Sequence, residues 1–396
     1  MQIADRLLKT PPYPFAELAR LKREAIANGV DLISFGIGDP DQPTPAFLVE
    51  AMQRAVENAE YHQYDETGYG DPVLLNAIAT WYEKRFGVTL DAKTEILRLI
   101  GSKEGIAHLS FAVLNPGDVV LVPDPGYPVY KVSTLFAGAE SYFMPLLAER
   151  GFTPDLAAIP ADVADKAKIM WLCYPNMPTG GTADLDFLAE AVAFAKQHDI
   201  LICMDMAYSE IYYDADYIPP SMLQVPGAKD VCIEFHSFSK PFNMTGWRLG
   251  WACGNPEALA ALDKMKSNVD SGAFRAIQEV GALALQTDTT AYFANLRAQY
   301  KRRRDLLVDG LNAAGWNVPK PKAAFYIWAP TPGGMNSADC AAKLLTECGI
   351  LVTPGSAYGP NGEGYVRFAL TITCSDPEAR IAEAVERIKT NFIVKV

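Results

Sequence analysis

The chain has 396 residues, which is long for a single domain and predicts two. Its formal net charge of -12 argues against nucleic acid as the main partner, because phosphate backbones bind basic surfaces. No apolar run is long enough for a membrane helix, and the first residues lack the pattern of a signal peptide. The seven cysteines are dispersed without C-x-x-C spacing. We therefore expect a cytoplasmic protein with no membrane partner and no metal site.

The first part of the chain predicts an arm followed by an α/β domain. A short helix is expected at about 16–28, and the Gly/Pro-rich stretch "FGIGDPDQPTP" suits a loop or interdomain arm. From residue 46 to about 285, apolar runs alternate with amphipathic helices, which indicates a mainly parallel sheet covered on both faces. The expected strands lie in "EILRLIGS", "DVVLVPDP", "KIMWLCYP", "ILICMDMAY" and "VCIEFHSFSK", and the expected helices span 72–86, 185–198 and 256–266.

The last part of the chain predicts a smaller α+β domain. A long helix covers "TAYFANLRAQYKRRRDLLVDGLNAAG", followed by strands in "AAFYIWAP" and "GYVRFALT", a helix near 337–348 and a last helix from 376. The basic run 301–304 is expected to be the solvated face of the long helix. We thus expect three parts, with 1–45 as an arm and part of the small domain, 46–285 as the large domain and 286–396 as the small domain.

Five expected strands of the large domain end in polar groups. These are Gly101-Ser102-Lys103, Asp124-Pro125-Gly126-Tyr127, Asn176, Asp205 with Tyr208, and Ser237 with Ser239 and Lys240. Each alone has an ordinary explanation as a turn or a helix cap. Ligands bind beyond the carboxyl ends of parallel strands, so we expect the five groups to converge on one site.

The chemistry of these groups suits one cofactor. A lysine such as Lys240 attacks an aldehyde when an apolar site lowers its pKa. A phosphate needs hydroxyls, amides at a helix start and a cation, and this set is supplied by Ser102, Ser237, Ser239 and Arg248. Asp205 can keep a pyridine nitrogen protonated, and Tyr127 can stack on a flat ring. Together these requirements describe pyridoxal phosphate.

The same segments resemble the class I and II aminotransferases of fold type I, which use pyridoxal phosphate. The resemblance covers nearly the whole chain, and it is carried by "SFSKPFNMTGWRLGW", "CMDMAY", "YPNMPTG", "IGSKEG", "PDPGYPVY" and "GYVRFAL". It implies a seven-stranded, mainly parallel sheet in the large domain.

Three longer segments are most similar to the LL-diaminopimelate aminotransferase-like branch of these enzymes. They are "IEFHSFSKPFNMTGWRLGWACGN", "SNVDSGAFRAIQEVG" and "LIGSKEGIAHL". The implied reaction moves an amino group between LL-2,6-diaminopimelate and 2-oxoglutarate in lysine biosynthesis. Aspartate, alanine and aromatic aminotransferases share the same core and are the alternatives, followed by a C–S lyase.

The resemblance also implies a role for each site residue. Lys240 forms the internal aldimine and then serves as the base for the proton shift. Arg367 and Gly38 bind the substrate carboxylate, and Tyr64 reaches the cofactor phosphate of the neighbouring subunit in a homodimer. The implied cofactor-binding residues are Ser102, Lys103, Tyr127, Asn176, Asp205, Tyr208, Ser237, Ser239, Arg248 and Tyr64.

One position departs from the family pattern. Relatives read N-N-P-T-G, and the asparagine directly before proline bonds the ring oxygen O3′, but here that position is Met177. Either Asn176 serves instead or Tyr208 alone bonds O3′, and we expect Asn176. The far end of the substrate is expected to meet polar candidates among Glu17, Lys103 and Asn268.

Overall fold

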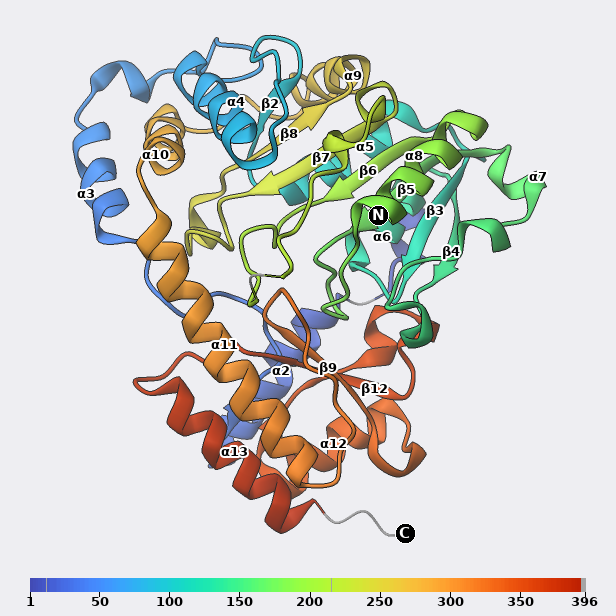
Figure 1. Cartoon of the computed structure of the whole chain (residues 1–396), viewed down its shortest axis with the longest axis vertical. Coiled ribbons are helices and arrows are strands. Elements are labelled where there is room, and N and C mark those ends of the chain that lie inside the picture. The colour runs from blue at the N-terminus through green and yellow to red at the C-terminus, as the bar shows by residue number, and fades with distance from the viewer. Residues whose placement is uncertain (12, 215, 393–396) are drawn as a thin grey trace.

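A computed structural model describes residues 1–11, 13–214 and 216–392, and its centre is a seven-stranded sheet (Figure 1). The strand order is β2-β8-β7-β6-β5-β3-β4. Strands β7, β6, β5, β3 and β4 run parallel, whereas β8 is antiparallel to both of its neighbours. The strands are β2 Ile96–Leu99, β3 Val119–Asp124, β4 Glu140–Pro145, β5 Ala167–Cys173, β6 Leu201–Asp205, β7 Cys232–Ser237 and β8 Gly250–Gly254. The predicted seven-stranded, mainly parallel sheet is confirmed.

Helices cover both faces of this sheet, which explains its continuous apolar strands. Along β5, Ile169 and Trp171 pack on the face covered by α5, α6 and α9, while Met170 and Leu172 face the opposite side, where α8 lies. The helices of this part are α3 Ala46–Ala55, α4 Pro72–Phe86, α5 Ser102–Val113, α6 Pro128–Phe136, α7 Ala161–Ala164, α8 Leu185–His198, α9 Pro256–Lys266 and α10 Arg275–Gln286. The ranges of α4, α8 and α9 agree with the prediction.

Local chemistry fixes the ends of these helices. The Asp71 carboxylate accepts a hydrogen bond from the Val73 amide at the start of α4, and Pro72 occupies the first helical position. Gly87 ends the helix in the left-handed conformation, at φ 67°. Such caps are local sequence features, which is why the helix bounds were predictable.

The C-terminal elements form a second group below the large sheet in Figure 1. Strands β11 Thr353–Pro354, β12 Tyr365–Ala369 and β9 Tyr326–Pro330 make an antiparallel sheet, flanked by α11 Thr290–Ala313, α12 Ser337–Cys348 and α13 Pro377–Asn391. The N-terminal segment joins this group, because β1 Ile33–Ser34 pairs with β10 Ile350–Leu351. The N-terminal helices are α1 Asp5–Leu8 and α2 Pro14–Ala27. The division into three parts, with boundaries after residues 45 and 285, stays a prediction.

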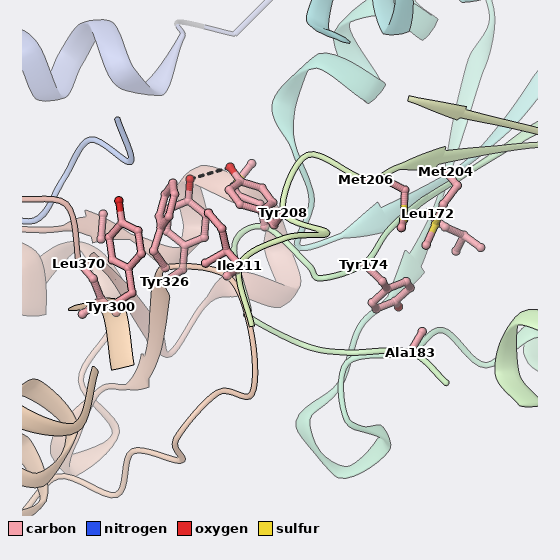
Figure 2. Packing of buried hydrophobic residues seen from close by; sticks show 14 of the residues in the cluster. Leu172, Tyr174, Ala183, Met204, Met206, Tyr208, Ile211, Tyr300, Tyr326 and Leu370 are labelled. Carbon is pink, nitrogen blue, oxygen red and sulfur yellow. Dashed lines mark hydrogen bonds between the residues drawn. The ribbon is translucent and has the colours of Figure 1, made fainter. Parts of the chain in front are cut away.

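Aromatic side chains pack where the two groups of elements meet (Figure 2). Tyr208, which follows β6, lies beside Tyr326 of β9, with ring centroids 5.4 Å apart.

Within the described ranges, no helix combines the length and apolar character needed to cross a membrane.

The basic run on α11 is not the solvated face that the sequence predicted. Arg303 and Arg304 are each only 3% exposed. Arg303 Nη1 lies 2.9 Å from the Asp41 carboxylate and also donates to the Leu370 carbonyl at 3.1 Å. Arg304 Nη1 donates to the Pro321 carbonyl at 2.9 Å. The prediction is wrong for these two arginines, because tertiary partners take them out of water.

We predict that Arg303→Ala lowers the free energy of unfolding by about 3–5 kcal/mol, because it leaves the Asp41 carboxylate buried without its cation. The Asp41 side chain is 1% exposed. On the same helix, Arg302 has a side chain that is 55% exposed, so Arg302→Ala should cost less than about 1 kcal/mol. Thermal and chemical denaturation of the two variants tests this, and equal losses would contradict it.

Candidate active site

A cavity of about 340 Å³ lies beyond the carboxyl ends of β5, β6 and β7. All but two of the predicted site residues line it, which places segments from residue 38 to residue 367 around one space. The predicted residues in its wall are Gly38, Ser102, Lys103, Tyr127, Asp205, Tyr208, Ser237, Ser239, Lys240, Arg248 and Arg367. Four of the five expected strand-end groups therefore converge on this cavity, and the group at Asn176 does not.

Lys240 follows β7 and extends into the cavity. Its Nζ donates a hydrogen bond to the Gly38 carbonyl at 3.0 Å and lies 5.8 Å from the centre of the Phe325 ring. Burial lowers the pKa of the Lys240 ammonium to about 8, although the nearby Asp39 charge opposes this shift. Half of the amine is therefore uncharged near pH 8, and an uncharged amine is the nucleophilic form.

Asp205 ends β6 on the cavity floor and is 5% exposed. Its carboxylate accepts a hydrogen bond from the Tyr130 hydroxyl at 2.8 Å and from the Ala207 amide at 3.3 Å. Burial raises the pKa of Asp205 to about 6, while the bond from Tyr130 lowers it. A cation placed against this carboxylate would offset the cost of its burial. The site thus suits a protonated ring nitrogen.

A cradle for an anion lies at the start of α5. Gly101 precedes the helix at φ +75°, and a Cβ there would overlap the guanidinium group of Arg248. Arg248 itself has a left-handed backbone at φ 58°, a conformation rare outside glycine and typical of functional sites. Ser237 and Ser239 add hydroxyls, and the Ser239 amide donates to Ser237 Oγ at 3.1 Å. Helix-start amides, hydroxyls and a guanidinium form a set that binds phosphate.

Arg367 provides a buried cation in the wall of the cavity. It lies on β12 with an exposed fraction of 0%, and its Nη2 donates to the Gly36 carbonyl at 2.7 Å. The guanidinium carbon lies 4.5 Å from the Tyr326 ring centre and 5.0 Å from that of Tyr358. These contacts fix the guanidinium plane, which suits bidentate binding of a carboxylate.

Asn176 does not line the cavity. Its amide nitrogen donates to the Cys173 carbonyl at 3.1 Å, and its oxygen accepts from the Thr179 hydroxyl at 2.7 Å. These bonds close the loop locally, and the side chain that lines the cavity from this loop is Met177. The structure therefore does not bring Asn176 to the place that the sequence suggested for it.

Tyr64 also lies away from the cavity. It is 81% exposed and lines a separate cleft together with Phe274 and other residues. Of the candidates for the far end of the substrate, only Lys103 lines the cavity, where its Nζ donates to Tyr13 Oη at 3.3 Å. Glu17 pairs with Arg20 on the exposed surface of α2.

Two tyrosines of the site were missed from the sequence. Tyr130 lies one helical turn after Tyr127 in "PDPGYPVY", and that spacing placed it on the same helix face. Tyr326 lies in "AAFYIWAP" and lines the cavity, with its hydroxyl 2.8 Å from that of Tyr208. An aromatic residue in an apolar strand is typical of a core position. The local sequence around Tyr326 therefore did not indicate that its hydroxyl lies in the site.

The cavity residues fit pyridoxal phosphate. The cofactor carries an aldehyde, a basic ring nitrogen and a phosphate, and the cavity offers a lysine with a lowered pKa, a buried carboxylate and an anion cradle. Tyr127 lines the same space and carries a flat ring suited to stacking. The fit rests on the number and the kind of these groups within one cavity.

Comparison with known proteins agrees with this chemistry. Residues 30–388 match the sequence profile of the family described as aminotransferase class I and II. The chain is 53% identical to an LL-diaminopimelate aminotransferase of Moorella thermoacetica and 51% identical to one of Syntrophobacter fumaroxidans, with 98% of both chains covered in each case. Among solved structures, substrate-bound BacF of Bacillus subtilis is 38% identical, covers 98% of both chains and superimposes with a TM-score of 0.93.

We predict that the Lys240 amine of the cofactor-free protein becomes reactive with a midpoint near pH 8, because burial favours its uncharged form. Reductive methylation with formaldehyde and cyanoborohydride, followed by peptide mass spectrometry, measures this midpoint. Lys320 is the control, since a hydrogen bond with Asp309 raises its pKa and so delays its reaction to higher pH. Coincident profiles for the two lysines would contradict the prediction.

Proposed function

The chain belongs to the class I and II aminotransferase family, and on that premise we propose that it transfers an amino group between LL-2,6-diaminopimelate and 2-oxoglutarate. The observation that carries the reaction class is the meeting of Lys240, Asp205 and Arg367 in one cavity. The choice of LL-2,6-diaminopimelate is supported by the names of relatives that share about half of its residues over nearly the full length. This reaction would serve lysine biosynthesis.

Pyridoxal phosphate is the cofactor of this proposal. Asp205 would hold the ring nitrogen, Tyr127 would stack on the ring, and the phosphate would lie among Ser102, Ser237, Ser239 and Arg248, with Lys103 adjacent. When bound, pyridoxal phosphate supplies an aldehyde that receives the amino group and a ring that takes up the electron pair left on the substrate Cα.

The chain's own residues hold the substrate and move its proton. Arg367 binds the α-carboxylate through two parallel hydrogen bonds and so fixes the direction of the Cα–H bond. Lys240 accepts the Cα proton at Nζ, which is possible because burial lowers its pKa to about 8. Tyr208 would donate a hydrogen bond to the ring oxygen of the cofactor. Gly38 offers its backbone at the edge of the same cavity.

We propose a cytoplasmic homodimer with a shared active site. The exposed ring of Tyr64, which lines the cleft beside Phe274, is available to a neighbouring subunit. The structure describes all seven cysteines, and each is a free thiol, as suits a reducing compartment.

A half-reaction screen tests the substrate. The protein loaded with pyridoxal phosphate is mixed with single amino acids, and transfer of the amino group is read from the loss of the visible absorbance band. LL-2,6-diaminopimelate should discharge this band faster than aspartate, alanine or phenylalanine, and added 2-oxoglutarate should restore it with formation of glutamate. Lys240→Ala should abolish turnover. A response to aspartate, alanine or phenylalanine but none to LL-2,6-diaminopimelate would overturn the substrate and leave the reaction class intact.

Arg367→Ala is expected to raise the KM for both amino acid and 2-oxoglutarate by roughly 10- to 100-fold, since a charge-assisted hydrogen bond contributes about 1.5–3 kcal/mol. The visible band should persist, because Arg367 is assigned to the substrate. Arg302→Ala removes one positive charge from an exposed position outside the cavity and serves as the matched control. An unchanged KM for every substrate in Arg367→Ala would remove the assigned role.

A further inference from the structure

The loop that carries Met177 leaves the cavity short of one polar contact. Met177 lines the cavity with a thioether, which is at best a weak hydrogen-bond acceptor and donates nothing. Its sulfur lies 3.5 Å from Arg367 Nη1, so it faces the guanidinium group that is assigned to the substrate carboxylate. The neighbouring Asn176 cannot compensate, because both ends of its amide are bound within the loop.

A second hydroxyl stands next to the one that faces the cofactor site. Tyr326 Oη lies 2.8 Å from Tyr208 Oη, and both side chains line the cavity while remaining buried, at 3% and 7% exposure (Figure 2). The rings meet edge to face, with centroids 5.4 Å apart. The two hydroxyls therefore form a buried pair that is largely shielded from bulk water.

The proton count of this pair fixes the direction of its hydrogen bond. Each phenol carries a single proton. An oxyanion placed against Tyr208 accepts a hydrogen bond from the Tyr208 hydroxyl, which uses the single proton of that phenol. The hydrogen bond between the two phenols must then be donated by Tyr326. A hydroxyl that accepts one hydrogen bond becomes a stronger donor in the next, because the two bonds polarise each other.

The fold holds the Tyr326 hydroxyl in this place from several sides. A Cβ at position 38 would overlap the hydroxyl, so only glycine leaves room for it. The guanidinium carbon of Arg367 lies 4.5 Å from the centre of the ring, and Phe325 packs against the Tyr208 ring at 5.3 Å. The position of the Tyr326 hydroxyl thus depends on the absence of a side chain at Gly38.

We propose that Tyr326 is a positioning residue that donates to Tyr208 and thereby supplies, through Tyr208, the stabilisation of the cofactor ring oxygen that the methionine at position 177 cannot provide. This inference rests on the proposed function, because it takes the cofactor to be pyridoxal phosphate. It assigns Tyr326 no contact with the substrate.

The test is the pH titration of the visible absorbance of the loaded enzyme without substrate. Tyr326→Phe keeps the ring and its stacking and removes only the hydroxyl. Weaker donation from Tyr208 leaves more negative charge on the ring oxygen, which then holds the proton shared with the Lys240 nitrogen more tightly. The midpoint of the titration should rise by about half a pH unit to one pH unit, as expected for one hydrogen bond.

Two further variants make the result specific. Met177→Asn restores a polar side chain to the loop and should return the midpoint of Tyr326→Phe toward that of the parent protein. Tyr300→Phe is the matched control, because Tyr300 lies in the same aromatic cluster and, within the described ranges, its buried hydroxyl has no hydrogen-bond partner (Figure 2). This control should leave the midpoint unchanged.

The outcomes separate this inference from the proposed function. If the parent protein shows no visible band with added pyridoxal phosphate, the proposed function fails. If the band is present and Tyr326→Phe leaves its midpoint unchanged, or Tyr300→Phe shifts it equally, the role of Tyr326 is overturned. Loss of the band in Tyr326→Phe supports the role only if Met177→Asn restores it, and loss that is not restored also overturns the role.

Discussion

Two ionisable groups of opposite sign are buried at the same cavity without neutralising each other. Lys240 donates to a backbone carbonyl and Asp205 accepts from a phenol, and within the described part of the chain no ion pair joins the two side chains. Burial moves both pKa values toward neutrality, to about 8 and about 6. Burying these two charges costs free energy, and a ligand that brings complementary groups to both offsets this cost. The anion cradle, Tyr127 and Arg367 line the same cavity as this pair.

Both ends of the chain are needed to complete this cavity. Gly38 comes from the N-terminal segment and Arg367 from a C-terminal strand, while Lys240 and Asp205 come from the central sheet. The buried ion pair between Arg303 and Asp41 anchors the N-terminal segment three residues after Gly38. The Gly38 carbonyl, in the same segment, accepts the hydrogen bond from Lys240.

Sequence patterns anticipated those features that depend on local chemistry. Strands buried on both faces produce continuous apolar runs, and caps such as Asp71 and Gly87 mark helix ends, so these elements were predictable. The strands β4 and β8 were missed because β4 is a partly exposed edge strand and β8 is a short run of small and aromatic residues.

Side-chain partners across the fold were not predictable from local patterns. A run of basic residues has the same sequence pattern whether it is solvated or pairs with a distant acid such as Asp41. The hydrogen bonds that Asn176 makes within its loop are likewise visible only in the folded structure. The candidate site was visible because strand ends carry its polar residues. The pairing of Tyr326 with Tyr208 was hidden, because a tyrosine in an apolar strand looks like core.

The reversed direction of β8 has a consequence for how the anion cradle is spaced. Because β8 is antiparallel to its neighbours, its first residue lies at the cavity edge, where Gly250 pairs with Leu99 of β2 and with Ser237 of β7. Arg248, two residues earlier, is thus held between the two segments that carry the serines. Because β8 lies between β2 and β7, the two serine-bearing segments are separated by two spacings between hydrogen-bonded strands, each about 4.8 Å. The hydrogen-bonded register of β8 with β2 and β7 thus fixes where Arg248 lies relative to the serines of the anion cradle.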